Sequence, residues 1–594
     1  MNHIKQLVFA AGLILSACQP KVERLTSFVS PMIGTTRGGN QTPGPHMPFG
    51  LLELSPVTKP DSVISATFYE AGDKEMYGFS LVNLVGTGCA SYGSVVIAPQ
   101  SGEPDVTKKK THFMDEVASV GYYKAHLCDH NILAEMTAST RSAVLKFTLP
   151  QGKNSVLIDL SRINSMDTAF SIRWISDTEI EGMRTDGQFC GKPGLHRVYF
   201  YAKLSVKPSV AGILKNNVVL SEKECAVKRD KLTAFAGYDV TSEKEVVEVR
   251  AAVSYVSTAN AKLNLETEIG DKTFDAVMTE CEDTWNKMLS RIEVEGGTVE
   301  QKTKFYTAIY HTMSHPNILN DVNGEYPAME TMKTMKASGH ERYTLYSLWD
   351  TYRTLHPFFT LAYPQVQSGM VNSMLDMYKE YGWLPHWECI SREKGVMNGD
   401  PALVVINDSW QKGIRDFNTD TALQAMIHNT KEVYQSDEAD RRNVEYIRKA
   451  KDPYWKNNGY IPQDYKTNGG DVWGVVATTE EYNIADWNLG QFAKSLGKDD
   501  VYQTYNTLSQ GYKFFYDSVT KFMRRRNADG SWTVPFNPFS TSGEMSWAYS
   551  GGPGYTEGHA WHYLLSLIHI LIRMPLTASA LLDPAALMLY TILL

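Results

Sequence analysis

Residues 551–563 gather the side chains best suited to chemistry. Their sequence, Gly-Gly-Pro-Gly-Tyr-Thr-Glu-Gly-His-Ala-Trp-His-Tyr, combines one carboxylate with two imidazoles and three aromatic rings. Glycines allow the backbone to turn sharply and to approach a ligand closely. Glu557 has aromatic neighbours, and apolar surroundings raise the pKa of a carboxyl toward the range useful for donating a proton to a sugar oxygen. A surface turn running into a buried helix would look the same, so both interpretations stay open at this point.

A second candidate is the run Ser347-Leu348-Trp349-Asp350-Thr351-Tyr352-Arg353. On a helix, Asp350 and Arg353 lie one turn apart and face the same side. They are either an ion pair on a solvated face, which contributes little, or the polar part of a site. In the second case Asp350 and Arg353 bind sugar hydroxyls beside the flat ring of Trp349.

The elements that would position these groups fall into two kinds. From about residue 27 to 265 the apolar period is two, as in Val247, Val249, Ala251 and Val253. Such alternation predicts half-buried antiparallel strands, and many of them together predict a β-sandwich. Two glycine-rich loops, residues 33–45 and 86–93, interrupt the strands. Neither precedes a helix in a βαβ unit, which argues against a phosphate loop, and they are either binding loops or plain turns.

Near residue 270 the apolar period changes to that of helices. Residues 266–299 are predicted to be a linker with its own helix, and residues 300–563 a helical domain. A broad apolar stripe runs from Leu345 to Phe359, a second helix begins with Thr419 and Asp420, and a third contains Asp486. Aromatic, glycine-containing loops join the helices. This pattern predicts a helical toroid with its site at the loop end.

The first 18 residues are predicted to be a lipoprotein signal peptide. Lys5 precedes a short apolar run that ends in Leu-Ser-Ala-Cys, and the run is too short for a membrane span. This order resembles a bacterial lipobox, so Cys18 would carry the lipid and tether an exported protein to a membrane. A plain signal peptide with an incidental cysteine is the alternative. The six other cysteines show no metal-binding spacing, and their pairing is not predicted.

Residues 564–594 differ from the rest of the chain. They are rich in Leu, Ile, Ala and Met without amphipathic spacing, and Arg573, Pro575, Asp583 and Pro584 divide them into pieces too short to span a membrane. The run Leu565-Ser566-Leu567-Ile568-His569-Ile570 resembles a translated sequencing adapter. We therefore expect a non-native tail that makes few specific core contacts, with the natural reading frame ending near Tyr563.

Composition excludes some functions. The 594 residues are 43% hydrophobic and 21% charged, which is ordinary for a globular protein of more than one domain. A formal net charge of -8 gives no reason to expect a nucleic-acid partner.

The ordered motifs resemble glycoside hydrolase family 92, the calcium-dependent exo-α-mannosidases of Bacteroidetes. The matching stretches follow the family's order: residues 40–50, ending in Pro-Phe-Gly; residues 77–93, beginning Tyr-Gly-Phe-Ser; residues 347–353; Gly-Trp-Leu-Pro at 382–385; Met-Asn-Gly-Asp at 397–400 through Lys-Gly-Ile at 412–414; Glu481-Tyr482 with Asp486-Trp487; and residues 555–563. Together they span almost all of residues 27–563.

The resemblance implies an N-terminal β-sandwich against an (α/α)6 barrel. It also implies an exported enzyme that acts on mannose-containing glycans by single-step inversion, with Glu557 as the general acid. A calcium ion would bind the O2 and O3 hydroxyls of the sugar, a task that suits a hard cation with oxygen ligands. The resemblance leaves the metal ligands of this chain unknown.

Three departures from the family pattern affect the predicted site. His559 and His562 replace the family's Asn and Gln beside Glu557, and Asn83 ends a Ser-Leu-Val-Asn run where the family has Ser-His-Thr-His; all three are candidate substrate contacts. The later Gly-Asn-Glu-Pro and Gly-Asn-Asp-Asp motifs, the second of which carries the general base, have no match. We therefore expect an incomplete barrel and a chain that is inactive as written. The alternatives are a non-catalytic glycan-binding lipoprotein or another (α/α)6 enzyme, such as a glycoside phosphorylase.

Overall fold

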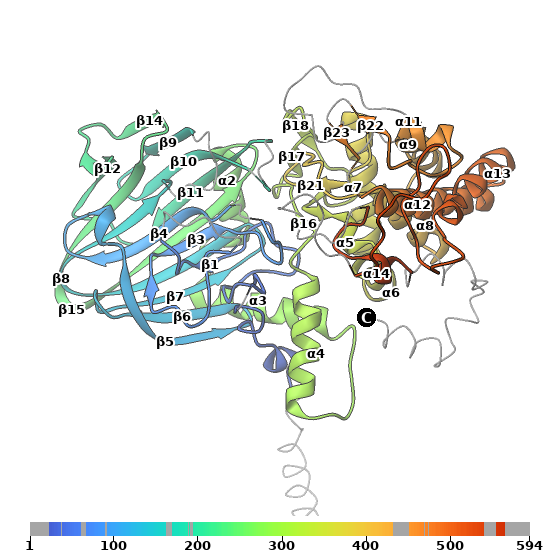
Figure 1. Cartoon of the computed structure of the whole chain (residues 1–594). Helices are drawn as coiled ribbons and strands as arrows, with labels where there is room; N and C mark the ends of the chain where they lie inside the picture. The colour runs from blue at the N-terminus through green and yellow to red at the C-terminus, as the bar shows by residue number, and fades with distance from the viewer. Residues whose placement is uncertain are drawn as a thin grey trace, which may run out of the picture.

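The structure is a computed structural model. It describes residues 23–36, 38–60, 67–89, 92–161, 169–187, 189–190, 194–431, 451–467, 470–472, 474–539 and 554–564. The predicted signal peptide with Cys18 and the tail beyond residue 564 lie outside these ranges. A β-rich domain comes first in the chain and a helical domain follows it, as Figure 1 shows in blue to green and in yellow to red. The predicted fold class is confirmed.

The β domain is a single hydrogen-bonded network of fifteen strands in the described ranges, and neighbouring strands such as β10 and β11, β8 and β15, and β7 and β8 pair antiparallel. The strands are β1 (Ser55–Pro56), β2 (Glu75–Met76), β3 (Phe79–Val82), β4 (Ser94–Ser101), β5 (Thr111–Ser119), β6 (Tyr122–Leu127), β7 (Ile132–Ala138), β8 (Ser142–Asp159), β9 (Ala169–Trp174), β10 (Glu179–Asp186), β11 (His196–Leu204), β12 (Val210–Lys215), β13 (Val218–Val219), β14 (Glu224–Lys228) and β15 (Leu232–Ser254).

Two long strands connect the halves of this network. β8 pairs with β7 through its first half and with β4 through its last six residues. β15 pairs with β8 along most of its length, with a register shift between Val240 and Lys244. Inward-facing side chains of β7, β8, β9 and β11 belong to one buried apolar cluster, so the core lies between the faces of these strands.

Three helices follow the β domain: α2 (Thr258–Glu268), α3 (Phe274–Leu289) and α4 (Val299–Thr312). The predicted helical spacing near residue 274 is α3, whose first turn is capped by the Thr273 side chain. α4 begins with a capping box between Thr298 and Gln301. In Figure 1, α3 and α4 lie at the base of the molecule, where the two domains meet.

The helical domain is built around α12 (Val475–Ser495). The other α-helices described in this domain are α5 (Leu348–Thr351), α6 (Leu355–Ala362), α7 (Pro364–Tyr381), α8 (Pro401–Gln411), α9 (Thr419–Lys431), α11 (Lys451–Lys456), α13 (Asp499–Leu508) and α14 (Ala560–Leu564). α12 packs against α8, α9 and α13 and is buried on most of its surface, as its sequence of Ala, Tyr, Leu and Phe at helical spacing favours. None of the helices in the described ranges is long and apolar enough to cross a membrane.

The predicted apolar stripe from Leu345 to Phe359 is wrong as a single helix. Leu345 has a left-handed backbone with φ of 64°, and the two-residue strand β20 (Tyr346–Ser347) pairs with β21 (Trp387–Glu388). Only then does α5 form, and it is separate from α6. The pairing of Tyr346 and Ser347 with β21 prevents these residues from joining the helix that the apolar spacing predicts. As a result Trp349 and Asp350 lie on a single helical turn, with Trp349 buried and Asp350 exposed.

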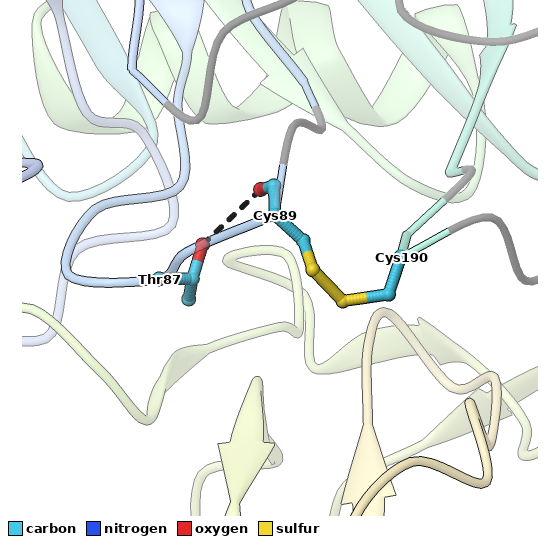
Figure 2. The surroundings of a disulfide bond; sticks show 3 residues. All are labelled: Thr87, Cys89 and Cys190. Carbon is cyan, nitrogen blue, oxygen red and sulfur yellow. Dashed lines mark hydrogen bonds between the residues drawn. A yellow bond between two sulfur atoms is a disulfide. The ribbon is translucent and has the colours of Figure 1, made fainter. Parts of the chain in front are cut away.

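A disulfide lies where loops of the β domain approach the helical domain. Cys89, in the second glycine-rich loop, is bonded to Cys190, which follows β10, and their Cα atoms are 5.2 Å apart (Figure 2). Nζ of the buried Lys394 donates to the carbonyl oxygens of Gly187 and Gly194, at 2.6 and 2.8 Å, on either side of Cys190. The loop that carries this cysteine is therefore fixed to both domains.

Candidate active site

The α5 turn presents three of the predicted substrate-binding residues. The Trp349 side chain is 8% exposed, and its indole Nε1 has no hydrogen-bond partner among the described residues. The guanidinium of Arg353 lies over the Trp349 ring, 4.8 Å from its centroid, which is a cation–π distance. Asp350 accepts a hydrogen bond from the Ser347 hydroxyl. An aromatic face, a carboxylate and an orphaned N–H donor together suit the binding of a sugar.

Arg353 pairs with a different carboxylate from the one expected. Its Nη2 lies 2.7 Å from Oε1 of Glu481 on α12, and the Tyr352 hydroxyl donates to the other oxygen of Glu481 at 2.9 Å. The surface ion pair between Asp350 and Arg353 that the sequence allowed is therefore replaced by a pair that bridges α5 and α12. The backbone of Gly399 packs against the side chain of Glu481, and a Cβ added to Gly399 would lie only 2.6 Å from the Glu481 Cβ. The φ of Gly399, 83°, is also a left-handed value that favours glycine.

The segment that carries Glu557 is held against the start of α12. The amides of Val476 and Ala477, in the first turn of that helix, donate to the carbonyl oxygen of Gly554 at 2.9 and 3.1 Å. These are the N–H groups that a helix start leaves without an internal partner. Glu557 itself has a left-handed backbone with φ of 48°. This conformation costs free energy for any residue that has a side chain larger than that of glycine.

The negative charge of Asp350 acts on the Glu557 carboxyl. The pKa of Glu557 is raised, first by burial of its carboxyl among neighbouring atoms and then by the negative charge of Asp350, while Arg353 opposes the rise. The pKa of Asp350 is also raised by burial, and Ser347, Arg353 and His386 oppose that rise. Both side chains remain open to solvent on one side. A carboxyl that keeps its proton to higher pH beside a second carboxylate can act as a general acid.

The other predicted contacts are placed differently. His559 and His562 are paired with each other: the His559 amide donates to Nδ1 of His562 at 3.2 Å, and the two rings are 4.2 Å apart. Asn83 is buried in the β domain, where its Nδ2 donates to the Glu53 carbonyl at 2.7 Å and its Oδ1 accepts from Ser80 at 2.9 Å. The described hydrogen bonds of Asn83 stay within the β domain, so its role in binding a substrate remains a proposal.

Two residues of the site escaped the sequence reasoning. Nε2 of His386 contacts the Asn398 carbonyl oxygen at 2.9 Å, and the Asn398 amide contacts the hydroxyls of Thr478 and Thr556 at 2.6 and 3.1 Å. Thr556 directly precedes Glu557. His386 and Asn398 occur inside motifs that the sequence marks, but the pattern alone gives no sign that hydrogen bonds connect them to Thr556, the residue before Glu557.

The residues of this site do not by themselves make a calcium site. Calcium takes six to eight oxygen ligands in most proteins. Asp350 and Glu557 supply two carboxylates, and within the described ranges no group of three or more His, Cys, Asp or Glu side chains gathers to hold a metal. The described residues therefore do not identify the ligands of the calcium ion that the family resemblance implies.

Comparison with known proteins identifies the family. The model of the glycosyl hydrolase family 92 N-terminal domain matches residues 28–254, and that of the family 92 catalytic domain matches residues 260–572. A secreted glycosidase of Arthroderma benhamiae, itself uncharacterised, is 26% identical over 526 residues. That match covers 82% of this chain, and the chain spans 62% of the length of this curated relative.

Solved structures similar to this chain come from the same family. A family 92 α-mannosidase of Bacteroides thetaiotaomicron has a TM-score of 0.80 at 30% identity, covering 91% of this chain and 71% of that protein. A structure of that mannosidase with mannoimidazole is similar, with a TM-score of 0.81 at 30% identity, covering 91% of this chain and 70% of the other. A family 92 inverting mannosidase of the same organism has a TM-score of 0.78 at 26% identity, covering 92% of this chain and 71% of the other. The chain therefore belongs to glycoside hydrolase family 92.

Proposed function

We propose that this protein is an exported exo-acting α-mannosidase that removes terminal mannose from glycans with inversion. The observation that carries the proposal is the raised pKa of Glu557, which is caused by burial and by the negative charge of Asp350. Asp350 lies on the same helical turn as Trp349, whose ring is a candidate surface for a sugar. Family membership and the mannosidase neighbours support the substrate class.

In the proposed reaction the protonated Glu557 carboxyl gives its proton to the glycosidic oxygen. The bond from the anomeric carbon to that oxygen breaks, and a water molecule attacks the opposite face. A general base takes the proton of that water, and in inverting enzymes the two carboxyls are about 6.5–9.5 Å apart. Asp350 accepts hydrogen bonds from sugar hydroxyls, and Arg353, held by Glu481, lowers the accumulated negative charge.

We propose that the polypeptide of these 594 residues is a poor catalyst. Among the described residues, the carboxylate whose charge acts on Glu557 is that of Asp350, which already accepts a hydrogen bond from Ser347. General base catalysis contributes about 10²–10⁴ in rate, and inversion offers no covalent route around it. The same observation favours a second candidate function, which is mannose binding without turnover.

The decisive experiment measures hydrolysis of 2,4-dinitrophenyl α-mannoside with and without azide, an anion that can replace the activated water. We expect slow release of dinitrophenol that azide accelerates, giving a β-mannosyl azide, because the C–O bond is replaced by a C–N bond with inversion. Binding of methyl α-mannoside with no turnover in either condition would select the glycan-binding function. Failure to bind any mannoside would overturn both.

Anchoring, export and the domain limits are further proposals. The lipobox supports lipidation of Cys18 and a location in the periplasm or at the outer membrane, and the secreted relative supports export. Fatty-acid labelling that is lost in Cys18→Ala tests the anchor, and unchanged labelling of that variant would rule it out. The proposed units are residues 27–265, 266–299 and 300–563, and limited proteolysis between them tests these limits.

A further inference from the structure

His386 is held rigidly next to the turn that carries Asp350. Its backbone carbonyl accepts from the amide of Leu348, the first residue of α5, at 3.3 Å. The next residue, Trp387, pairs with Ser347 across the β20–β21 strands. The backbone amide of His386 donates to Glu393 at 2.9 Å. The imidazole is therefore fixed against the helix start that presents the candidate sugar-binding carboxylate.

One nitrogen of this imidazole has a defined role. Nε2 lies 2.9 Å from the carbonyl oxygen of Asn398. A carbonyl oxygen only accepts hydrogen bonds, so Nε2 carries the hydrogen and donates it. In the neutral ring this leaves Nδ1 with a lone pair, which needs a donor.

That donor is missing from the described part of the chain. The His386 side chain is 6% exposed, and its Nδ1 has no hydrogen-bond partner among the described residues. A buried acceptor without a donor costs free energy, so native structures fill such positions with a ligand or an ordered water. The backbone of His386 is hydrogen-bonded to Leu348, which lies two residues before Asp350 on the same helical turn. Two acceptors, one imidazole nitrogen and one carboxylate, thus occur together.

We propose that His386 is a further substrate-binding residue, whose Nδ1 accepts a hydrogen bond from one hydroxyl of the mannose ring while Asp350 accepts from another. This inference rests on the proposed function. A sugar offers several hydroxyl donors on adjacent carbons, which matches two acceptors presented by neighbouring elements. The orphaned Trp349 Nε1 donor on the same turn adds a third unsatisfied group. An ordered water is the competing occupant of the His386 position.

The test compares two substitutions of the same residue. Gln in His386→Gln has an amide that reaches the Nε2 position and preserves the contact with Asn398, but it removes the acceptor at Nδ1. Asn in His386→Asn places an acceptor near Nδ1 and loses the contact with Asn398. His130→Gln is the matched control, because Nε2 of His130 likewise lies 3.1 Å from a carbonyl oxygen, that of Lys108 in the β domain.

The measurement is the Kd of methyl α-mannoside and of its 2-, 3-, 4- and 6-deoxy analogues, by NMR titration. In the wild-type chain one deoxy analogue should bind about three- to tenfold more weakly than the parent, the range expected for one lost hydrogen bond. That difference should disappear in His386→Gln, return in part in His386→Asn and persist in His130→Gln.

The possible outcomes separate the two proposals. If the wild-type chain binds methyl α-mannoside but His386→Gln discriminates among the deoxy analogues as the wild type does, His386 is not a substrate contact and only water occupies its Nδ1. The proposed function survives that result. If the wild-type chain binds neither methyl α-mannoside nor any analogue, the proposed function fails and the role of His386 fails with it.

Discussion

Nη2 of Arg353 lies 2.7 Å from Oε1 of Glu481, and this ion pair joins the α5 turn to the central helix α12. The Glu481 side chain is 8% exposed and that of Arg353 is 34% exposed, so the pair is only partly screened by water. Because Arg353 also acts on Glu557, the partner of Arg353 controls how strongly its positive charge reaches the proposed acid. Glu481 is therefore a positioning residue for the candidate site.

We predict that Glu481→Gln destabilises the chain and leaves the proposed acid deprotonated over more of the pH range. Leaving Arg353 without its carboxylate should cost about 1–2 kcal/mol in the free energy of unfolding, since one partner is a third exposed. The uncompensated charge should also lower the pKa of Glu557. Urea denaturation and the pH profile of mannoside hydrolysis measure the two effects. Glu300→Gln, which removes a fully exposed pair with Lys304, is the control; equal behaviour of the two variants would refute the prediction.

The Cys89–Cys190 disulfide should contribute to stability through the loop that it closes. The two cysteines are 101 residues apart in sequence, and cross-links over loops of about 100 residues are worth roughly 4–5 kcal/mol in the chain-entropy model, often less in practice. We expect Cys89→Ser/Cys190→Ser to lower the urea midpoint, and a reductant to lower that of the wild type similarly. Cys128→Ser/Cys225→Ser, which removes two free thiols, should leave the midpoint unchanged. A reductant-insensitive wild type would contradict the prediction.

Glu53 should make the stability of the chain depend on pH. Burial raises the pKa of Glu53 from an ordinary value near 4.5 to about 8. Nε2 of His315 lies 3.7 Å from the Glu53 carboxylate, and burial lowers the pKa of that imidazole. Because the folded pKa is above the unfolded one, the contribution of Glu53 to stability is complete below pH 4.5. It is then lost as the pH rises toward 8, by at most about 1.4 kcal/mol per pH unit.

Glu53→Gln tests this dependence, because glutamine is neutral at every pH and similar in shape. The stability of the variant relative to the wild type should rise steadily between pH 5 and pH 8. Thermal unfolding across that range provides the measurement. A constant difference between the two proteins would show that Glu53 is ionised in the folded state.

Calcium should bind the chain alone only weakly. Within the described ranges no third acidic or histidine ligand joins Asp350 and Glu557, whereas calcium takes six to eight oxygens, so we expect a calorimetric titration to show no site tighter than the millimolar range. EDTA should therefore leave the unfolding temperature unchanged. Micromolar calcium binding that disappears in Asp350→Asn would contradict this expectation.

The two-domain fold could be predicted because each half of the chain has its own apolar period, and because the family motifs occur in order. The turn that carries Asp350 could not, since its helical spacing is interrupted by the pairing of β20 with β21, a contact between residues about 40 positions apart. The arrangement of the candidate site also depends on contacts between residues that are far apart in the sequence. Sequence patterns pointed to Glu557 and Asp350 separately, whereas the partnership of Arg353 with Glu481 and the position of His386 depend on how α5, α12 and the loop at residues 386–399 pack.

The central claim, that Glu557 is the proton donor, is tested most directly by how its loss depends on the leaving group. The rates of Glu557→Gln and of the wild-type chain are compared on 2,4-dinitrophenyl α-mannoside and on an α-linked mannobiose, both with azide present. The dinitrophenolate leaves without protonation, whereas a sugar alkoxide does not. We predict that the variant retains most of the rate on the first substrate and loses at least about a hundredfold on the second. Equal losses on both substrates would contradict the assignment of Glu557 as the acid.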